Sequence, residues 1–168
     1  MIGTKTDGRS NIRYYRLEFG NVKFYRWLQL IGLTPSKSKT IGKLDIPDKL
    51  FIDFLRGSLD GDGYSFSYWD PIWRNSFRFY IGFSSASLNH LLWLESQITR
   101  LYSIKGRIGL TKGCYKLVFA KYSSLELAHN IYYKEKLICL KRKKFKIDQA
   151  LDIISKQAGV SKLVDDYP

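Results

Sequence analysis

Alternating apolar and polar positions predict four β-strands between residues 64 and 120. The longest is 76–84, where the stretch FRFYIGF alternates throughout and is rich in aromatic side chains. Turn residues between the alternating stretches divide them into two pairs. The predicted strands are 64–69, 76–84, 106–110 and 114–120, the last two joined by a turn at Lys112 and Gly113.

Apolar residues spaced three or four positions apart predict helices around these strands. One helix begins at Pro47 and Asp48, because proline suits a first helical turn and a carboxylate is favourable at the positive end of the helix dipole. Its apolar face continues to Leu59. Further helices are predicted at 87–102, at 123–140 and around 147–154. Residues 47–158 therefore form an αββαββα unit with a last helix, and 159–168 are expected to be a loose tail.

A strand and a helix are also predicted near the start of the chain, at 13–19 and 22–31. Shifted by 100 positions, they fall on a later predicted strand and helix. The matched positions are Tyr15 with Tyr115, Phe19 with Phe119 and Ile31 with Ile131, and basic segments follow both copies at 36–39 and 141–144. Two interpretations stay open. The match is a coincidence between common strand–helix orders, or residues 1–46 resemble the back half of a preceding repeat.

The composition adds a strong positive charge to this picture. The 168 residues include 28 Lys and Arg against 15 Asp and Glu, a formal charge of +13 with a pI near 9.7. Since such a charge is costly through self-repulsion, it favours a polyanionic partner, above all a nucleic acid. The 45% hydrophobic content excludes a chain that is disordered by composition.

Membrane insertion and secretion are both disfavoured by the sequence. No stretch reaches 18 apolar residues, and no signal peptide is recognisable. We therefore expect a cytoplasmic protein, or one of an organellar matrix. Cys114 and Cys139 are expected to be reduced thiols, and His90 and His129 to be packing residues.

The segment FLRGSLDGDGY, residues 54–64, carries the candidate chemistry. Gly57 and Gly61 lie four positions apart, so they share one helical face on which a second helix can approach closely. Asp62 follows at the negative end of the helix, where a carboxylate is unfavourable unless a cation binds there. Mg²⁺ suits such a position, since it takes carboxylate and carbonyl oxygens and bridges to phosphate. Asp62 and the Gly61 carbonyl are therefore candidate ligands.

Three other interpretations of DGDG were considered. A plain turn does not account for the small-residue spacing before it. A calcium loop fails because its sixth and twelfth positions are Ser65 and Pro71. A phosphate-binding loop fails because the Gly-Lys-Ser/Thr ending is missing and a helix precedes the segment.

The stretch LRGSLDGDG resembles the LAGLIDADG motif of homing endonucleases and intron maturases. The matching residues are Leu55, Gly57, Leu59, Asp60, Gly61, Asp62 and Gly63, and the preceding IPDKLFIDFLRG also resembles the family's lead-in to a second motif. The resemblance implies an α+β fold with an antiparallel four-stranded, DNA-binding saddle. It implies that Asp62 is the metal-binding catalytic carboxylate and that Asp60 supports the helix end. Leu55, Gly57, Ser58, Asp60 and Gly61 would form the motif helix and its interface.

The resemblance also implies further site residues. A lysine often lies near the active site just before the last helix, and Lys143 is the best match. Ser85 takes the place of a polar residue that helps to position solvent. The predicted nucleic-acid contacts are Tyr68, Trp73, Arg74, Arg78, Tyr80, Ser84, Ser85, Lys112, Lys116, Lys141, Arg142, Lys37 and Lys39.

Two function classes follow from one motif in one chain. The first is a site-specific DNA endonuclease that uses Mg²⁺ or another divalent cation to hydrolyse phosphodiesters, with Lys143 stabilising the developing charge. Because double-strand cleavage needs two centres, we expect a homodimer through the helix at 48–60. The second class is an inactive relative that regulates DNA or binds intron RNA as a maturase.

Overall fold

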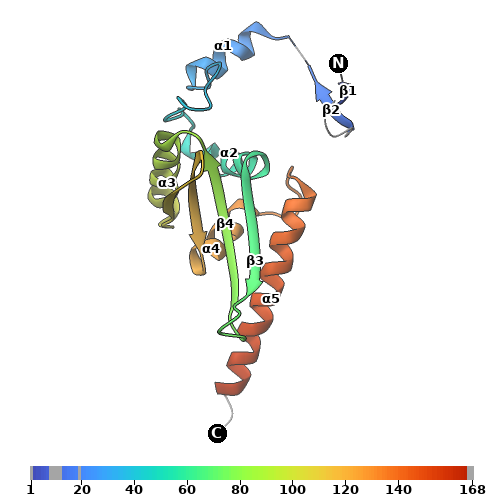
Figure 1. Cartoon of the computed structure of the whole chain (residues 1–168), viewed down its shortest axis with the longest axis vertical. Coiled ribbons are helices and arrows are strands. Elements are labelled where there is room, and N and C mark those ends of the chain that lie inside the picture. The colour runs from blue at the N-terminus through green and yellow to red at the C-terminus, as the bar shows by residue number, and fades with distance from the viewer. Residues whose placement is uncertain (1, 8–12, 19, 166–168) are drawn as a thin grey trace.

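The computed structural model describes residues 2–7, 13–18 and 20–165 (Figure 1). Its elements are β1 (Ile2–Thr6), β2 (Arg13–Leu17), α1 (Val22–Leu30), α2 (Asp48–Gly61), β3 (Gly63–Trp69), β4 (Phe77–Ser85), α3 (Leu88–Tyr102), β5 (Arg107–Thr111), β6 (Cys114–Ala120), α4 (Tyr122–Ile131) and α5 (Lys141–Asp165). The order from α2 to α4 is αββαββα, so the predicted α+β fold unit is confirmed. None of the described helices is long and apolar enough to cross a membrane.

The main sheet has four antiparallel strands in the order β3-β4-β6-β5. Both predicted pairs are hairpins, and β4 and β6 join them at the centre. Each predicted strand boundary lies within one residue of the observed one. Thr111 pairs with Cys114, which places Lys112 and Gly113 at the turn as expected.

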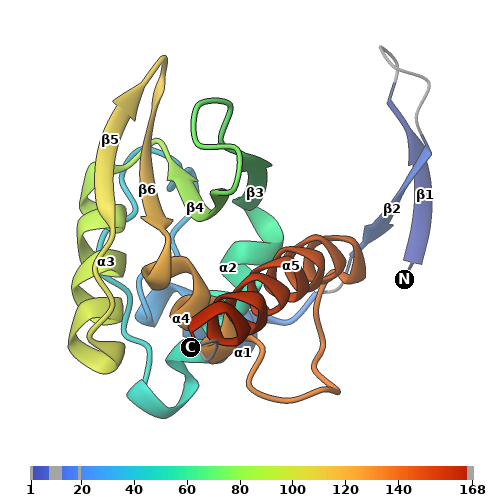
Figure 2. The same cartoon turned by 90° about the horizontal axis from the view of Figure 1, so that it is seen from below.

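One face of this sheet carries the hydrophobic core. Phe79, Ile81 and Phe83 of β4 and Leu117 and Phe119 of β6 are buried, and they alternate along their strands as a half-buried sheet requires. Helices α2, α4 and α5 lie together on one side of the sheet (Figure 2), and side chains of α2 to α5 join the same core. The opposite face of the sheet is left open.

The N-terminal elements stand apart from this body (Figure 1). β1 and β2 form a two-stranded antiparallel sheet, and α1 buries none of its residues. β1 was missed by the pattern analysis. The end of the predicted strand at Phe19, and with it the match to Phe119, lies outside the described residues.

The segment between α1 and α2 is anchored on the body. Ser87 donates to the carbonyl of Ile41, and His90 Nδ1 lies 3.0 Å from the carbonyl oxygen of Gly42. Leu44 is buried in the core. His90 is thus a packing residue as predicted, and burial lowers its pKa although the contact with Gly42 acts in the opposite direction.

Two helices differ from prediction. The helix expected at 123–140 ends at Ile131, where the carbonyl accepts a hydrogen bond from Arg56 of α2, and 132–140 form a connection. The last helix begins at Lys141, so the basic run is helical, and it continues to Asp165 into the expected tail. His129 is exposed in the last turn of α4, so the prediction that it packs in the interior was wrong.

Candidate active site

The end of α2 gives its two aspartates different surroundings. Asp62 is the C-cap, its N–H donating to the Ser58 carbonyl at 3.1 Å, and its side chain is exposed without a hydrogen-bond partner among the described residues. Asp60 Oδ2 instead accepts from the N–H of Leu140 at 2.8 Å, immediately before α5. Asp60 therefore has a structural contact at a helix end, whereas Asp62 is free to bind a ligand.

Gly63 brings β3 tightly against the last turn of α2. A Cβ built at this position would lie 2.6 Å from Leu59 Cα, closer than real contacts allow. The glycine is therefore required for close approach, which fixes Asp62 at the junction of helix and strand.

A cavity of about 720 Å³ lies beside Asp62, between α2, the end of β4 and the segment that follows α1. Its lining includes seven of the predicted site residues: Lys37, Gly57, Ser58, Gly61, Asp62, Ser84 and Ser85. The structure thus brings the motif helix and the end of the second strand of the unit together at one cavity. Ser85 Oγ there accepts from the N–H of Ser87.

The glycine face of α2 is open. Phe51, Leu55 and Leu59 on the other side of the helix are buried in the core. No atom lies within 4 Å of a Cβ built at Gly57 or Gly61. The structure of one chain therefore leaves room along this face for another helix.

Lys143 reaches the end of α2 from the first turn of α5. Its ammonium donates to the carbonyl oxygens of Leu59 at 2.7 Å, Gly61 at 3.3 Å and Gly63 at 2.6 Å. A lysine has three donors, and all three are directed at these carbonyls. Burial lowers the pKa of Lys143, with repulsion from Arg142 adding to the effect. The geometry is that of a residue that positions the motif.

The residues at the end of α2 can be compared with the ligands that a divalent cation requires. Within the described residues, no three His, Cys, Asp or Glu side chains gather closely enough to hold a metal ion. Mg²⁺ commonly binds through one or two carboxylates and completes its shell with waters and phosphate oxygens. Asp62 fits that role, whereas the Gly61 carbonyl already accepts from Lys143.

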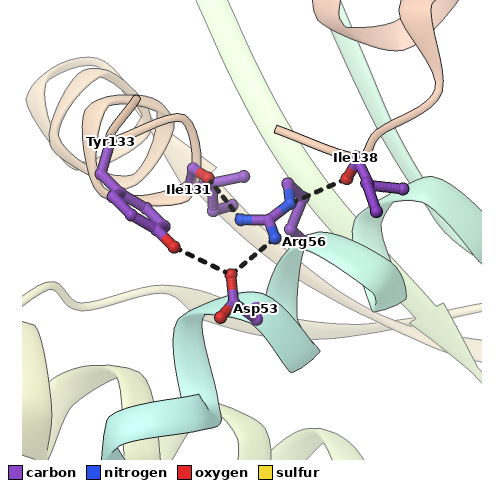
Figure 3. Close-up of polar contacts among 5 residues, drawn as sticks. All are labelled: Asp53, Arg56, Ile131, Tyr133 and Ile138. Atoms are coloured by element: carbon purple, nitrogen blue, oxygen red, sulfur yellow. Dashed lines mark hydrogen bonds and ion pairs between the residues drawn. The ribbon is translucent and has the colours of Figure 1, made fainter. Parts of the chain in front are cut away.

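Arg56 is a site residue that the sequence analysis missed (Figure 3). It is 7% exposed and donates to the carbonyls of Ile138 at 3.1 Å and Ile131 at 3.3 Å. Its remaining nitrogen lies 2.6 Å from Asp53, and Tyr133 donates to the same carboxylate oxygen. The guanidinium holds the motif helix to the end of α4 and lowers the pKa of Asp53. Only the tertiary structure reveals these partners, since they lie 75 and 82 positions away.

The predicted contact residues on the strands share the open face of the sheet. Register places Tyr68, Arg78, Tyr80, Ser84 and Lys116 opposite the core side. Trp73, Arg74 and Lys112 are exposed in the hairpin loops, and Lys37, Lys39, Lys141 and Arg142 are exposed elsewhere. The open face and the Asp62 cavity meet at Ser84. Ser85, the last residue of β4, also lines the cavity, while the other predicted contacts on the sheet do not.

Arg78 has an acidic partner within the chain. Its guanidinium makes two hydrogen bonds to Asp70 Oδ2, at 3.0 and 2.9 Å. The other Asp70 oxygen accepts from the N–H groups of Ile72 and Trp73, and these backbone bonds, with Arg78, lower the pKa of Asp70. Asp70 therefore shapes the loop between β3 and β4, which presents Trp73 to solvent.

Comparison with known proteins gives two similar solved structures. No protein-family model and no curated protein sequence matches the chain. The homing endonuclease I-CvuI, crystallised with the I-CreI target and 2 mM Mg with the DNA uncleaved, is 17% identical over 66% of this chain and 69% of its own, with a TM-score of 0.49. The homing endonuclease I-TnaI is 14% identical over 69% of this chain and 77% of its own, with a TM-score of 0.46.

Proposed function

We propose that this protein is a site-specific DNA endonuclease that hydrolyses phosphodiesters with a divalent cation bound at Asp62. The observation that carries the proposal is the exposed, unpartnered carboxylate of Asp62 at the end of an open helix face. The resemblance of residues 55–63 to the LAGLIDADG motif and the charge of +13 support it.

The chemistry divides between the cation and the chain. A bound Mg²⁺ supplies a Lewis acid for the scissile phosphate and lowers the pKa of an attacking water. Asp62 would hold the cation, and Ser85 would help to orient solvent in the same cavity. Lys143 would keep the end of α2 in place. To contact the phosphate, the Lys143 ammonium would have to release one of its three carbonyl partners. The Gly61 carbonyl, at 3.3 Å, is the longest and weakest of these contacts.

A second carboxylate would come from a second copy of the chain. Two α2 helices packed through Gly57 and Gly61 would bring both Asp62 side chains to one end of the interface, as double-strand cleavage requires. Both glycines line the cavity beside Asp62, and the absence of a Cβ at each favours the approach of a second helix.

The N-terminal segment has the same order of elements as the second half of the αββαββα unit. β1, β2 and α1 repeat the order of β5, β6 and α4, and α1 at 22–30 corresponds to α4 at 122–131 with an offset of 100. We infer that residues 1–46 are equivalent to the back half of an αββαββα unit.

The test is cleavage of a library of duplex DNA targets with Mg²⁺. We expect double-strand breaks at a preferred sequence, and a rate that falls at least 100-fold in Asp62→Asn while DNA binding is kept. Asp152→Asn, an exposed carboxylate on α5, is the matched control and should cleave normally. Broadening of resonances around residue 62 by Mn²⁺ should disappear in Asp62→Asn alone. A wild-type protein that binds DNA but never nicks it would overturn the enzymatic proposal and favour a regulator or maturase.

A further inference from the structure

A row of aromatic rings crosses the open face of the sheet. Phe66 of β3 stacks on Tyr80 of β4 with ring centroids 4.6 Å apart and planes within 9° of parallel. Tyr64 and Tyr68 continue the row along β3, with centroids 6.1 and 6.3 Å from that of Phe66. We call these four residues the aromatic row.

No helix of the described chain covers this row. The core-facing residues of β4 are Phe79, Ile81 and Phe83, so Tyr80 points to the other side. Phe66 and Tyr68 remain 44% and 43% exposed. Large aromatic side chains held in an ordered row on a solvent-facing surface are typical of a binding site.

The charge around the row fits a polyanion. None of the strands β3 to β6 contains an acidic residue. Arg107 and Lys116 share the open face, and Lys116 Nζ lies 5.8 Å from the centre of the Tyr64 ring. Lys116 lies on β6, next to the row, and Arg107 lies on the edge strand β5 beyond it, so both can contact a phosphate backbone that crosses the open face.

The side chains on this face suit unpaired bases better than the edges of paired ones. Reading a duplex groove needs paired donors and acceptors, as on Arg, Asn or Gln. Next to the row, Arg78 is paired with Asp70, Arg107 lies two strands away on β5, and β3 to β6 contain no Asn or Gln. Aromatic rings instead stack on the faces of bases that have left a duplex or belong to a single strand.

We propose that the aromatic row binds an unpaired polynucleotide strand, with bases stacked against Phe66 and Tyr68 and phosphates held by Arg107 and Lys116. The proposal rests on the nucleic-acid role proposed above and does not require cleavage at Asp62. It adds a second kind of ligand, an unpaired strand, to the duplex that the endonuclease would cut.

The experiment measures binding of a labelled mixed-sequence strand, made as DNA and as RNA, to the full chain. Two control ligands are measured beside it: the same DNA as a duplex, and a strand of equal length made of abasic sites. They separate the contribution of base stacking to affinity from that of the phosphate charge. We expect the base-containing strands to bind at least tenfold more tightly than the abasic strand. Phe66→Leu and Tyr68→Leu should each weaken that binding about tenfold, since stacking of one base on an aromatic ring contributes of this order.

Tyr122→Leu is the matched control, because Tyr122 is 80% exposed on α4, away from the row. It should bind all strands like the wild type, and circular dichroism should show that each variant is folded. Equal affinity for abasic and base-containing strands, or equal losses for single strand and duplex, would overturn the proposal. The DNA and RNA arms decide which polymer is preferred. Asp62→Asn should bind single strands normally, so failure of cleavage and failure of stacking are distinguishable.

Discussion

The ammonium of Lys143 lies 2.6 Å from the carbonyl oxygen of Gly63, at the junction between α2 and β3. The same group also bonds the last turn of α2, so one side chain of α5 places a positive charge at the negative end of the motif helix. The favourable charge at this helix end is therefore supplied at least in part by the chain itself.

Replacing Lys143 by methionine should destabilise the protein. The change removes charged hydrogen bonds to three carbonyls, so we expect the free energy of unfolding to fall by about 1.5–3 kcal/mol. Chemical denaturation measures this, and Lys141→Met, an exposed neighbour in the same turn, is the control. An unchanged stability combined with lost cleavage would show that Lys143 acts on the phosphate instead of positioning the motif.

Replacing Arg56 by methionine should be more disruptive. The methionine retains much of the side-chain volume but leaves the carbonyls of Ile131 and Ile138 without their donor and Asp53 without its ion-pair partner, for an expected loss of about 2–4 kcal/mol. Amide hydrogen exchange should accelerate most at 131–140, because Arg56 holds this connection to α2. Tyr133→Phe, which removes only the hydroxyl bonded to Asp53, should cost clearly less. Similar losses in both variants would contradict the central position given to Arg56.

Gly57→Ala should have opposite effects on the stability of the isolated chain and on its self-association. Nothing in the chain meets a Cβ at this position, and alanine favours a helix over glycine by about 0.5–1 kcal/mol. The isolated chain should therefore become more stable. In the proposed dimer the extra methyl groups would separate the two helices, so dimer dissociation should become at least tenfold easier.

Sedimentation velocity across micromolar concentrations measures the second effect. Glu126→Ala, on the exposed side of α4, should leave association unchanged. A wild-type chain that stays monomeric throughout this range would reject the homodimer.

His90 should make stability depend on pH. Burial lowers its pKa in the folded state, so the unfolded chain takes up the proton first as the pH falls. The free energy of unfolding should thus be unaffected by this group above about pH 6.5 and decrease as the pH falls below it toward the lowered folded value. Denaturation curves between about pH 5 and 7.5 should show this slope in the wild type. His90→Gln should remove the slope, and the exposed His129→Gln should keep it.

The parts of the fold that were predictable are those set by local periodicity. The alternation in β4 defined both its bounds and the face of Tyr80, because side-chain direction in a strand follows from residue parity alone. The spacing of Gly57 and Gly61 likewise indicated an open helical face, and a Cβ built at either glycine would meet no other described residue within 4 Å, the backbone of the helix itself aside.

The remaining features depend on contacts between distant positions. The carbonyl of Ile131 at the end of α4 accepts from Arg56, 75 residues earlier, and the apolar periodicity that continues beyond Ile131 gave no sign of this helix end. Parity placed Arg78 on the expected face, but it gave no sign of the ion pair that this residue forms with Asp70. The carboxylate of Asp60, at the end of α2, accepts from the N–H of Leu140 just before α5, a contact between positions 80 residues apart.

Tyr64 lies over Gly82, and any Cβ at position 82 would collide with its ring. The set of residues tolerated at one of these two positions therefore depends on the residue at the other. A side chain at 82 requires the Tyr64 ring to move from its place or to be exchanged for a smaller residue, and either change removes one ring from the aromatic row. Among homologues, glycine at 82 should be inherited together with an aromatic residue at 64.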